Sequence, residues 1–227
     1  MKREILITND GSTTIHLPEW NEQYHSKHGA IQEAYHVFIN SGLYQFKDQD
    51  EISILEVGFG TGLNCFITFL EGIKHKMNIN YVGVEGYPVE EKEIKLLNYI
   101  SELNAKDFSK VFENMHSASW NKQHQITESF SLIKRQQFFK EITDENRYHL
   151  IYFDAFGARV QPELWTVEIF KKMSNALKMN GLLVTYAAKG SVRRAMQKAG
   201  LSVERLPGPP GKREMLRAKK HSTSVKG

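Results

Sequence analysis

A short apolar run that ends in three closely spaced glycines places the strongest constraint on how this chain folds. The segment 52–57 has the length and composition of a buried strand, and residues 58–64 read Gly-Phe-Gly-Thr-Gly-Leu-Asn. From Leu63 onward, apolar residues recur with helical spacing, so the glycines lie between a strand and a helix. Glycine lets the backbone turn sharply close to a ligand, and the free N–H groups of the following helix point to the same place. The sequence therefore predicts a nucleotide-binding turn, with a glycine-rich turn that holds no ligand as the alternative.

The spacing of the glycines argues against two common nucleotide sites. A dinucleotide fingerprint needs Gly-x-Gly-x-x-Gly, but Leu63 stands where its third glycine would be. A phosphate-binding loop needs Gly-Lys-Ser/Thr, which does not follow. The remaining pattern, an acid followed by Gly-x-Gly-x-Gly, resembles the first motif of class I S-adenosylmethionine (SAM) methyltransferases. That resemblance implies SAM as the cofactor, with Glu56 behind the turn meeting its amino group directly or through water. The cofactor-binding residues predicted in this motif are Glu56, Gly58, Gly60, Thr61, Gly62 and Asn64.

Length and composition fit one large α/β domain with a small N-terminal addition. The 227 residues are 41% apolar and 25% charged, which is ordinary for a globular protein. No run approaches the eighteen or so apolar residues that span a bilayer, and segment 1–5 lacks the apolar core of a signal peptide. We therefore expect a cytoplasmic protein without membrane contact. The single cysteine, Cys65, excludes an internal disulfide, and we interpret it as a buried thiol rather than a nucleophile.

Segments typical of strands and helices alternate through the rest of the chain. We expect strands at 79–85, 148–154 and 182–188, and helices at 30–40, 90–103, 191–198 and from Pro162 to a stop at Asn180–Gly181. Between residues 105 and 147 the periodicity is weak, and we expect one strand there, around 131–135. Strands separated by helices predict a parallel, doubly wound sheet.

Hairpins are predicted at both ends of the chain. Near the N-terminus, Asn9-Asp-Gly-Ser12 joins two short β-like segments, and Asp-Gly tolerates the positive φ angles of a tight turn. Near the C-terminus, 201–206 and 213–218 flank a Pro- and Gly-rich turn, which suggests an antiparallel pair at the sheet edge. We therefore predict the Rossmann-like α/β fold of a class I SAM methyltransferase, with an antiparallel terminal hairpin. Residues 1–48 would form a hairpin-and-helix extension and residues 49–227 the methyltransferase domain.

Two acids stand at the ends of predicted strands, where ligands bind in open α/β sheets. Glu85 lies twenty-three residues past Gly62, close to the spacing at which an acid meets ribose hydroxyls. The alternative is an exposed acid at a strand end. Asp154 ends an apolar run and is the catalytic candidate, with a loop-capping residue as the alternative. No Asn/Asp-Pro-Pro-Tyr motif follows, so we expect a nucleophile other than an exocyclic base amine.

Neither a metal site nor a serine triad is supported. His25, His28 and His36 lie in one region, but no cysteine or paired acid completes a ligand set. We interpret this region, with Tyr24 and Glu33, as a polar wall over the cleft. No serine sits in a Gly-x-Ser-x-Gly elbow.

Positive charge gathers near the C-terminus. The net charge is +4, and six basic residues between Arg205 and Lys220 face a single acid, Glu214. A basic face near a predicted active site favours an anionic partner such as nucleic acid. A solvated tail is the alternative.

Five segments taken together carry a more specific resemblance. They are Asp10–Ser12, Tyr24–Ala30 with Glu33, Ile54–Asn64, Tyr152–Phe156 with Pro162–Trp165, and Gly208–Met215. They resemble the methyltransferase of the MnmC type over nearly the whole chain, from Thr8 to Ala218. That resemblance implies methylation of a 5-aminomethyl group on (2-thio)uridine at the tRNA wobble position, which gives 5-methylaminomethyl-2-thiouridine.

The mechanism that this resemblance implies gives Asp154 a role, and residue type and location alone suggest roles for the others. Asp154 would hold the acceptor ammonium, orient it and receive or relay its proton. Tyr24 or Phe156 would stack on the extruded uridine, and Lys212 and Arg213 would meet backbone phosphate, while Glu33 would complete the substrate-binding wall.

One segment departs from the family pattern. Where such enzymes have Gly-Asp near the adenine, residues 136–139 read Gln-Gln-Phe-Phe, which leaves the adenine contacts of this segment open. Many family members also carry a flavin-dependent oxidase domain. Because this sequence stops at Gly227, we expect that activity to be absent and separate upstream enzymes to supply the aminomethyl precursor.

Two other functions stay open. One is a SAM-dependent transferase that acts on a small-molecule amine, which would not need the basic C-terminal hairpin. The other is a non-catalytic RNA-binding module with a decayed cofactor site, although the intact glycines and strand-end acids argue against it.

Overall fold

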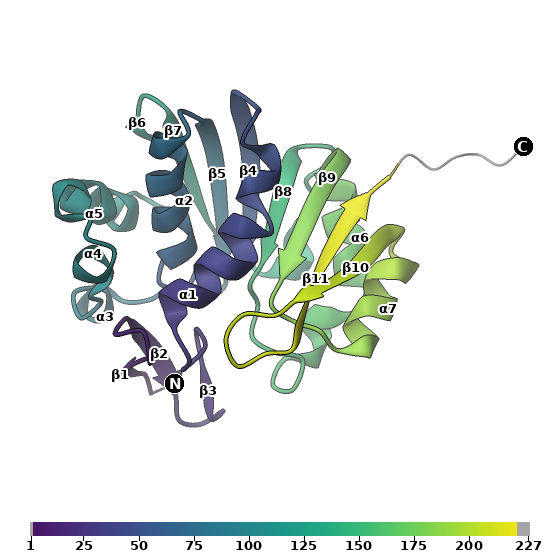
Figure 1. The fold of residues 1–227 in the computed structure, drawn as a ribbon, viewed down its shortest axis with the longest axis horizontal. Coiled ribbons are helices and arrows are strands. Elements are labelled where there is room, and N and C mark those ends of the chain that lie inside the picture. Colours follow the sequence, from purple (N-terminus) through teal and green to yellow (C-terminus); the bar gives the residue numbers. More distant parts are fainter. Residues whose placement is uncertain (1, 222–227) are drawn as a thin grey trace, which may run out of the picture.

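A single mixed β-sheet organises the chain, as seen in a computed structural model that describes residues 2–221 (Figure 1). Within these residues its strand order is β10-β11-β9-β8-β4-β5-β7-β6. The central pairs are parallel, and β6, β10 and β11 are antiparallel to their neighbours. The strands are β4 (Glu51–Val57), β5 (Asn78–Glu85), β6 (Gln123–Thr127), β7 (Phe130–Gln136), β8 (Tyr148–Phe153), β9 (Leu177–Thr185), β10 (Leu201–Pro207) and β11 (Glu214–Lys220).

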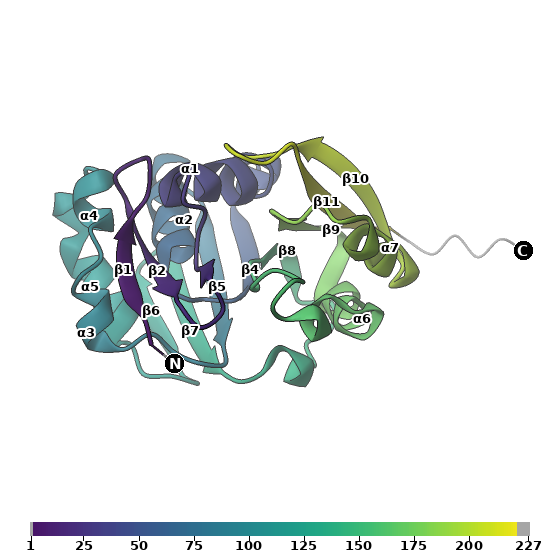
Figure 2. The same ribbon diagram turned by 90° about the horizontal axis from the view of Figure 1, so that it is seen from below.

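Helices cover both faces of this sheet and bury a hydrophobic cluster on each side. Figure 2 shows α1 and α2 on one side and α6 on the other. One cluster contains Val37, Phe66 and Phe112, and the second contains Phe170 and Met196. The helices are α1 (Ala30–Ala34), α2 (Leu63–Lys74), α3 (Glu91–Ile94), α4 (Tyr99–Glu102), α5 (Ser109–Ser117), α6 (Val167–Ala176) and α7 (Gly190–Lys198). A π-helical segment, η1 (Tyr35–Asn40), continues α1, and short 3₁₀ turns lie at η2 (Leu43–Phe46), η3 (Lys106–Phe108), η4 (Phe139–Glu141) and η5 (Pro162–Trp165).

A small antiparallel sheet packs beside the carboxyl ends of the parallel strands. It consists of β1 (Glu4–Ile7), β2 (Thr13–Leu17) and β3 (Glu22–Gln23). The Arg3 guanidinium donates hydrogen bonds to the carbonyls of Tyr87 and Pro88, which follow β5. The Asn98 side chain accepts from both the backbone N–H and the hydroxyl of Thr13. These contacts fix the N-terminal sheet against the loops that follow the central strands.

The main features predicted from the sequence are confirmed. The parallel central strands, the glycine turn between β4 and α2, the N-terminal β1–β2 hairpin and the antiparallel β10–β11 pair all form. The domain boundary at residues 48 and 49 stays a prediction, because α1 and η1 bury Ala30 and Phe38 in the same cluster as α2. No helix within residues 2–221 is long and apolar enough to cross a bilayer.

Three predicted elements were wrong in detail. Segment 90–103 forms two short helices, because Asn98 turns its side chain to Thr13 and interrupts the helical run. The helix expected to stop at Asn180–Gly181 ends at Ala176, and β9 begins at once with Leu177. Between residues 105 and 147 the structure adds α5 and β6 to the one predicted strand, β7. The short, polar β6 pairs with β7 alone, so its sequence carries no clear alternation.

Close packing behind the glycine turn makes Gly83 on β5 a sensitive position. A Cβ atom added there would lie 2.2 Å from Cδ2 of Phe59, which sits within the turn. We predict that Gly83→Ala lowers the free energy of unfolding by roughly 1–3 kcal/mol, because Phe59 and the turn must shift. Urea denaturation measures this. Gly157→Ala is the control, since the nearest atom to its added Cβ is the Tyr186 hydroxyl at 3.7 Å. Equal stability of the two variants would contradict this packing argument.

Candidate active site

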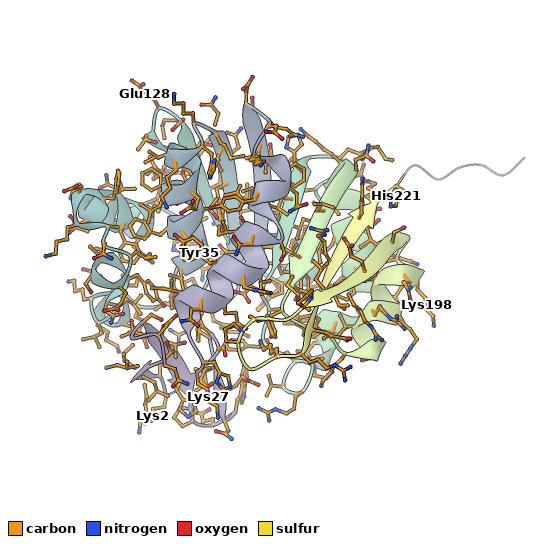
Figure 3. The ribbon with its side chains drawn as sticks, viewed as in Figure 1. Lys2, Lys27, Tyr35, Glu128, Lys198 and His221 are labelled. Carbon is orange, nitrogen blue, oxygen red and sulfur yellow. The ribbon has the colours of Figure 1, made fainter. Side chains whose placement is uncertain are left out.

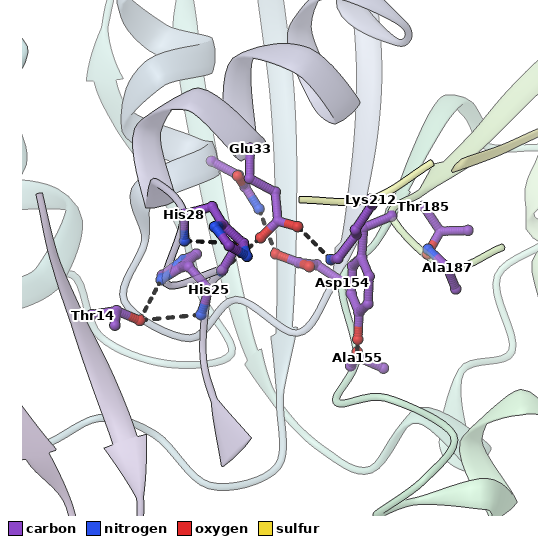
Figure 4. Close-up of polar contacts among 12 residues, drawn as sticks. Thr14, His25, His28, Glu33, Asp154, Ala155, Thr185, Ala187 and Lys212 are labelled. Carbon is purple, nitrogen blue, oxygen red and sulfur yellow. Dashed lines mark hydrogen bonds and ion pairs between the residues drawn. The ribbon is translucent and has the colours of Figure 1, made fainter. Parts of the chain in front are cut away.

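A cavity of about 1270 Å³ lies at the carboxyl ends of the parallel strands. It is lined by the glycine turn, by the residues that follow β5 and β8, by the N-terminal segment 20–28 and by the β10–β11 loop. Figure 4 shows Glu33 and Lys212 close to Asp154, with His25 and His28 on the side of the N-terminal segment. The cavity therefore brings together residues from nearly the full length of the described chain.

The glycine turn forms one wall of the cavity. Gly58 has φ +98°, and an added Cβ there would lie 2.6 Å from the carbonyl oxygen of Asp154. The turn is held from β5, because the N–H groups of Gly58 and Phe59 donate to the Val84 carbonyl. The N–H of Gly60 donates to Oε2 of Glu85 at 3.0 Å. Glycine is thus required at position 58 by both backbone conformation and space.

Glu56 lies behind this turn and does not reach the cavity. Its carboxylate is 1% exposed and accepts two hydrogen bonds, from Nδ2 of Asn64 at 2.9 Å and from the Tyr81 hydroxyl at 2.8 Å. Burial raises the pKa of the Glu56 carboxyl well above its usual value, and the two donors oppose that shift. Glu56 contacts Asn64, which does line the cavity, and its predicted contact with the cofactor, directly or through water, stays a prediction.

Asn64 joins the carboxylates of Glu56 and Asp154. Its Nδ2 also donates to Oδ2 of Asp154 at 2.9 Å, so one amide nitrogen bonds both Glu56 and Asp154. Its Oδ1 is buried and has no hydrogen-bond partner among residues 2–221. A buried amide oxygen without a partner is unfavourable, so a ligand N–H group that reached this atom would satisfy it.

Two residues of the predicted motif support the turn from outside the cavity. The Thr61 hydroxyl accepts a hydrogen bond from the Tyr99 hydroxyl at 3.0 Å. Gly62 begins α2 in the left-handed region and packs against the imidazole of His116. Neither residue lines the cavity, whereas Gly58, Gly60 and Glu85 do.

Asp154 follows β8 and is partly exposed inside the cavity. Burial first, and then the negative charge of Glu33, raise the pKa of its carboxyl to about 7. The hydrogen bond from Asn64 and the positive charge of Lys212 act in the opposite direction. A carboxyl that titrates near neutral pH can accept a proton and release it again, as general base catalysis requires.

Other predicted residues surround Asp154. Tyr24, Glu33, Phe156 and Lys212 line the cavity, and the rings of Tyr24 and Phe156 meet edge to face at 5.1 Å. Nζ of Lys212 lies 2.5 Å from Oε1 of Glu33, so this lysine points into the cavity. Arg213, its neighbour, is exposed.

The histidines of the N-terminal segment belong to the wall of the cavity. The Thr14 hydroxyl accepts from the backbone N–H of His25 and also contacts Nδ1 of its ring. Burial lowers the pKa of His25 to about 4, so its imidazole is neutral at pH 7. No group of three or more His, Cys, Asp or Glu side chains in the described chain is arranged to hold a metal ion.

Sequence reasoning missed an aromatic pair at the far end of the cavity. Tyr87, after Glu85, is 65% exposed and Phe138, after β7, is 46% exposed, with ring centroids 5.8 Å apart. Both line the cavity. Large exposed aromatic side chains at a cavity mark a binding surface. The Gln-Gln-Phe-Phe departure was the available signal, because it places aromatic rings where the family pattern has Gly-Asp.

A family model described as S-adenosyl-L-methionine-dependent methyltransferase matches residues 98–221, just over half of the chain. The chain belongs to this methyltransferase family. The predicted class of enzyme and its cofactor, SAM, are thereby confirmed.

Curated proteins similar to this chain share about a quarter of its residues over the aligned region. The tRNA 5-methylaminomethyl-2-thiouridine biosynthesis bifunctional protein MnmC of Burkholderia mallei (strain SAVP1) is 26% identical over 227 residues, covering 93% of this chain and 34% of that protein. The same is true of its counterpart in Burkholderia pseudomallei (strain 668). The chain thus spans about a third of the length of these curated relatives.

Solved structures confirm the predicted fold class. MNMC2 from Aquifex aeolicus superposes with a TM-score of 0.75 at 24% identity, over 96% of this chain and 70% of that one. Spermidine synthase from Thermotoga maritima gives a TM-score of 0.56 at 13% identity, over 96% and 68%. At these identities the two likenesses establish the fold alone.

The cavity fits the methionine end of SAM. The free Oδ1 of Asn64 is an acceptor for an ammonium group, and it is held in place because its Nδ2 is bonded to Glu56. Gly58 and Gly60 leave the adjacent wall free of side chains. The Glu85 carboxylate on the same wall is an acceptor of the kind that ribose hydroxyls need.

We predict that Asn64→Ala raises the dissociation constant for SAM at least about tenfold, since it removes an acceptor for a charged group and leaves Glu56 with one donor fewer. Isothermal titration calorimetry measures this. Asn114→Ala, at an exposed asparagine of α5, is the control. Unchanged SAM affinity in Asn64→Ala would remove Asn64 from the cofactor site.

The aromatic pair predicts a second effect on SAM binding. If the adenine stacks on Phe138, Phe138→Ala should weaken SAM roughly 5- to 150-fold, the range of base–aromatic stacking. Leu96→Ala is a matched control, because Leu96 is an exposed apolar residue that does not line the cavity. Equal SAM affinities for the two variants would show that Phe138 does not contact the adenine.

Proposed function

We propose that this methyltransferase transfers the SAM methyl group to the 5-aminomethyl nitrogen of (2-thio)uridine at the tRNA wobble position, giving 5-methylaminomethyl-2-thiouridine. The observation that carries this proposal is the position of Asp154, which lines the cavity and is bonded to the Asn64 side chain, whose Oδ1 has no partner among residues 2–221. Asp154 would therefore lie beside both the methyl donor and the acceptor.

Several residues would hold the cofactor. Asn64 would accept from its ammonium group, Glu85 from its ribose hydroxyls, and Tyr87 and Phe138 would flank its adenine. Glu56, Thr61 and Gly62 lie behind the cavity wall. Glu56 would hold the Asn64 side chain in place, and Thr61 and Gly62 would hold the glycine turn. When bound, SAM supplies an electrophilic methyl group on a sulfonium.

An amine acceptor needs a group that removes its proton. An alkylammonium has a pKa of about 10, taking lysine as the reference, so at neutral pH its nitrogen lacks a free electron pair. Asp154 would accept a hydrogen bond from the ammonium and take one proton. The N–H electron pair then stays on nitrogen and forms the new N–C bond, while the C–S electron pair leaves with sulfur. The pKa of about 7 keeps a useful fraction of Asp154 ionised near neutral pH.

Aromatic rings on the acceptor side of the cavity support a nucleobase as the group that carries the amine. The centroid of the Phe156 ring lies 5.1 Å from that of Tyr24 and 5.7 Å from that of Trp20, and both pairs are T-shaped. Rings grouped in this way offer stacking faces to a base that is turned out of an RNA loop.

The printed names of the relatives and the surface charge support tRNA as the partner. Lys189 after β9, Arg194 on α7 and Arg213 on the β10–β11 loop are exposed. Figure 3 also shows Lys27 beside the N-terminal sheet. Separate upstream enzymes would supply the aminomethyl precursor, and the reaction would take place in the cytoplasm.

The decisive experiment supplies methyl-labelled SAM with tRNA that carries 5-aminomethyl-2-thiouridine and identifies the labelled nucleoside by mass spectrometry. Free 5-aminomethyluridine and a simple diamine are the competing substrates. Faster transfer to the diamine than to tRNA would favour a small-molecule amine as the substrate. Binding of tRNA without transfer to any acceptor would favour a non-catalytic RNA-binding module.

We predict that Asp154→Asn lowers the rate of methyl transfer by roughly 10²- to 10⁴-fold, the usual contribution of a general base, because an amide cannot take the proton. SAM binding should persist, since Asn64 keeps its bond to Glu56. Single-turnover assays at saturating SAM measure the rate. Asp107→Asn, at an exposed aspartate, is the control. A fully active Asp154→Asn enzyme would exclude Asp154 as the base.

A further inference from the structure

The loop between β10 and β11, residues 208–213, reaches across the cavity to the N-terminal helix. Nε2 of His36 lies 2.8 Å from the carbonyl oxygen of Pro207, at the start of the loop. Gly211 packs so closely that an added Cβ would lie 2.2 Å from the ring of His28. Figure 1 shows the loop beside the N-terminal end of α1. These contacts set the position of the next residue, Lys212.

Lys212 is held inside the cavity by two contacts. Its Nζ donates to Oε1 of Glu33 at 2.5 Å and lies 3.8 Å from the centre of the Tyr186 ring. The other oxygen of Glu33 accepts from the backbone N–H of Ser26 at 2.8 Å. The Glu33 side chain is 8% exposed and that of Lys212 is 32% exposed. The Lys212 ammonium therefore pairs with a buried carboxylate.

Charged groups face Asp154 from every element packed around it. Glu33 comes from α1, Lys212 from the β10–β11 loop and Glu56 from β4. The neutral neighbours are the hydroxyl of Tyr186, which follows β9, and the Asn64 amide of α2. His25, which faces Glu33, is neutral. Glu33 and Lys212 act on Asp154 in opposite directions, so their charges offset each other as long as both are present.

We propose that Lys212 and Glu33 are positioning residues that act as one neutral pair and leave Asp154 as the cavity carboxylate open to the acceptor amine. This inference rests on the proposed function. It replaces the phosphate contact predicted for Lys212, and it leaves Arg213 as the phosphate-binding residue of the loop.

Removal of either partner gives effects of opposite sign. Without Lys212, the uncompensated charge of Glu33 favours the protonated form of Asp154, which cannot take a proton from the amine. Without Glu33, the charge of Lys212 favours the ionised form. With both removed, neither charge acts on Asp154, so the balance between its protonated and ionised forms returns close to that of the wild type.

The experiment follows the Asp154 carboxyl directly by ¹³C NMR in the full chain labelled with [¹³C]aspartate, and assigns the signal with Asp154→Asn. Wild type should titrate with a midpoint near pH 7. Lys212→Met should move the midpoint upward by about one pH unit or more, and Glu33→Gln should move it downward, as expected for single neighbouring charges. The double variant should return close to wild type. The acid limb of the methyl-transfer pH profile should move in the same directions.

Arg213→Gln is the matched control on the same loop, because it should weaken tRNA binding without moving the Asp154 midpoint. Lys212→Gln provides a second variant if Lys212→Met does not fold. Unchanged midpoints in both single variants, or shifts of the same sign, would overturn the proposal. A Lys212→Met variant with higher KM for tRNA but an unshifted midpoint would restore the phosphate role. Since the titration needs no tRNA, it decides this inference even if wild type transfers no methyl group to tRNA.

Discussion

Burial of two carboxylates at adjacent strand ends is the constraint around which this site is built. An ionised carboxylate inside a protein is strongly unfavourable without hydrogen-bond donors or a countercharge. Here the Tyr81 hydroxyl and the Asn64 amide satisfy Glu56, and the same amide nitrogen bonds Asp154. Because Nδ2 of Asn64 serves both acids, its buried Oδ1 is left without a hydrogen-bond partner among residues 2–221. The polar groups that stabilise the fold thus also create the acceptor offered to the cofactor.

Segments near the two ends of the chain complete the walls of the cavity at the strand ends. The N-terminal sheet binds the loop after β5 through Arg3, and the segment around α1 supplies Tyr24 and Glu33. The β10–β11 loop then closes onto α1 and brings a cation to Glu33. An open α/β sheet places its ligand at the strand ends but does not enclose it. In this chain the segments near both termini form the enclosure, because Tyr24, Glu33 and Lys212 line the cavity.

Whether the sequence predicts a contact in the site depends on how many positions separate the two residues in the chain. The glycine turn, Glu85 and Asp154 follow from local patterns, because a strand ending in glycine or in an acid constrains only its immediate neighbours. The Lys212–Glu33 pair joins residues 179 positions apart, and no spacing rule connects them. The Tyr87–Phe138 pair likewise depends on β5 and β7 being neighbours in the sheet. Glu56 was correctly placed behind the turn, but its role through Asn64 required the side-chain geometry.

The central claim is that the acceptor amine meets Asp154 next to the cofactor site that Asn64 defines. A crystal structure with S-adenosylhomocysteine and an anticodon stem-loop carrying 5-aminomethyl-2-thiouridine tests it most directly. The account predicts the aminomethyl nitrogen within hydrogen-bonding distance of the Asp154 carboxylate, with the Asn64 Oδ1 bonded to the ammonium of the cofactor. An aminomethyl nitrogen bound away from Asp154, with the uridine outside the cavity, would contradict it.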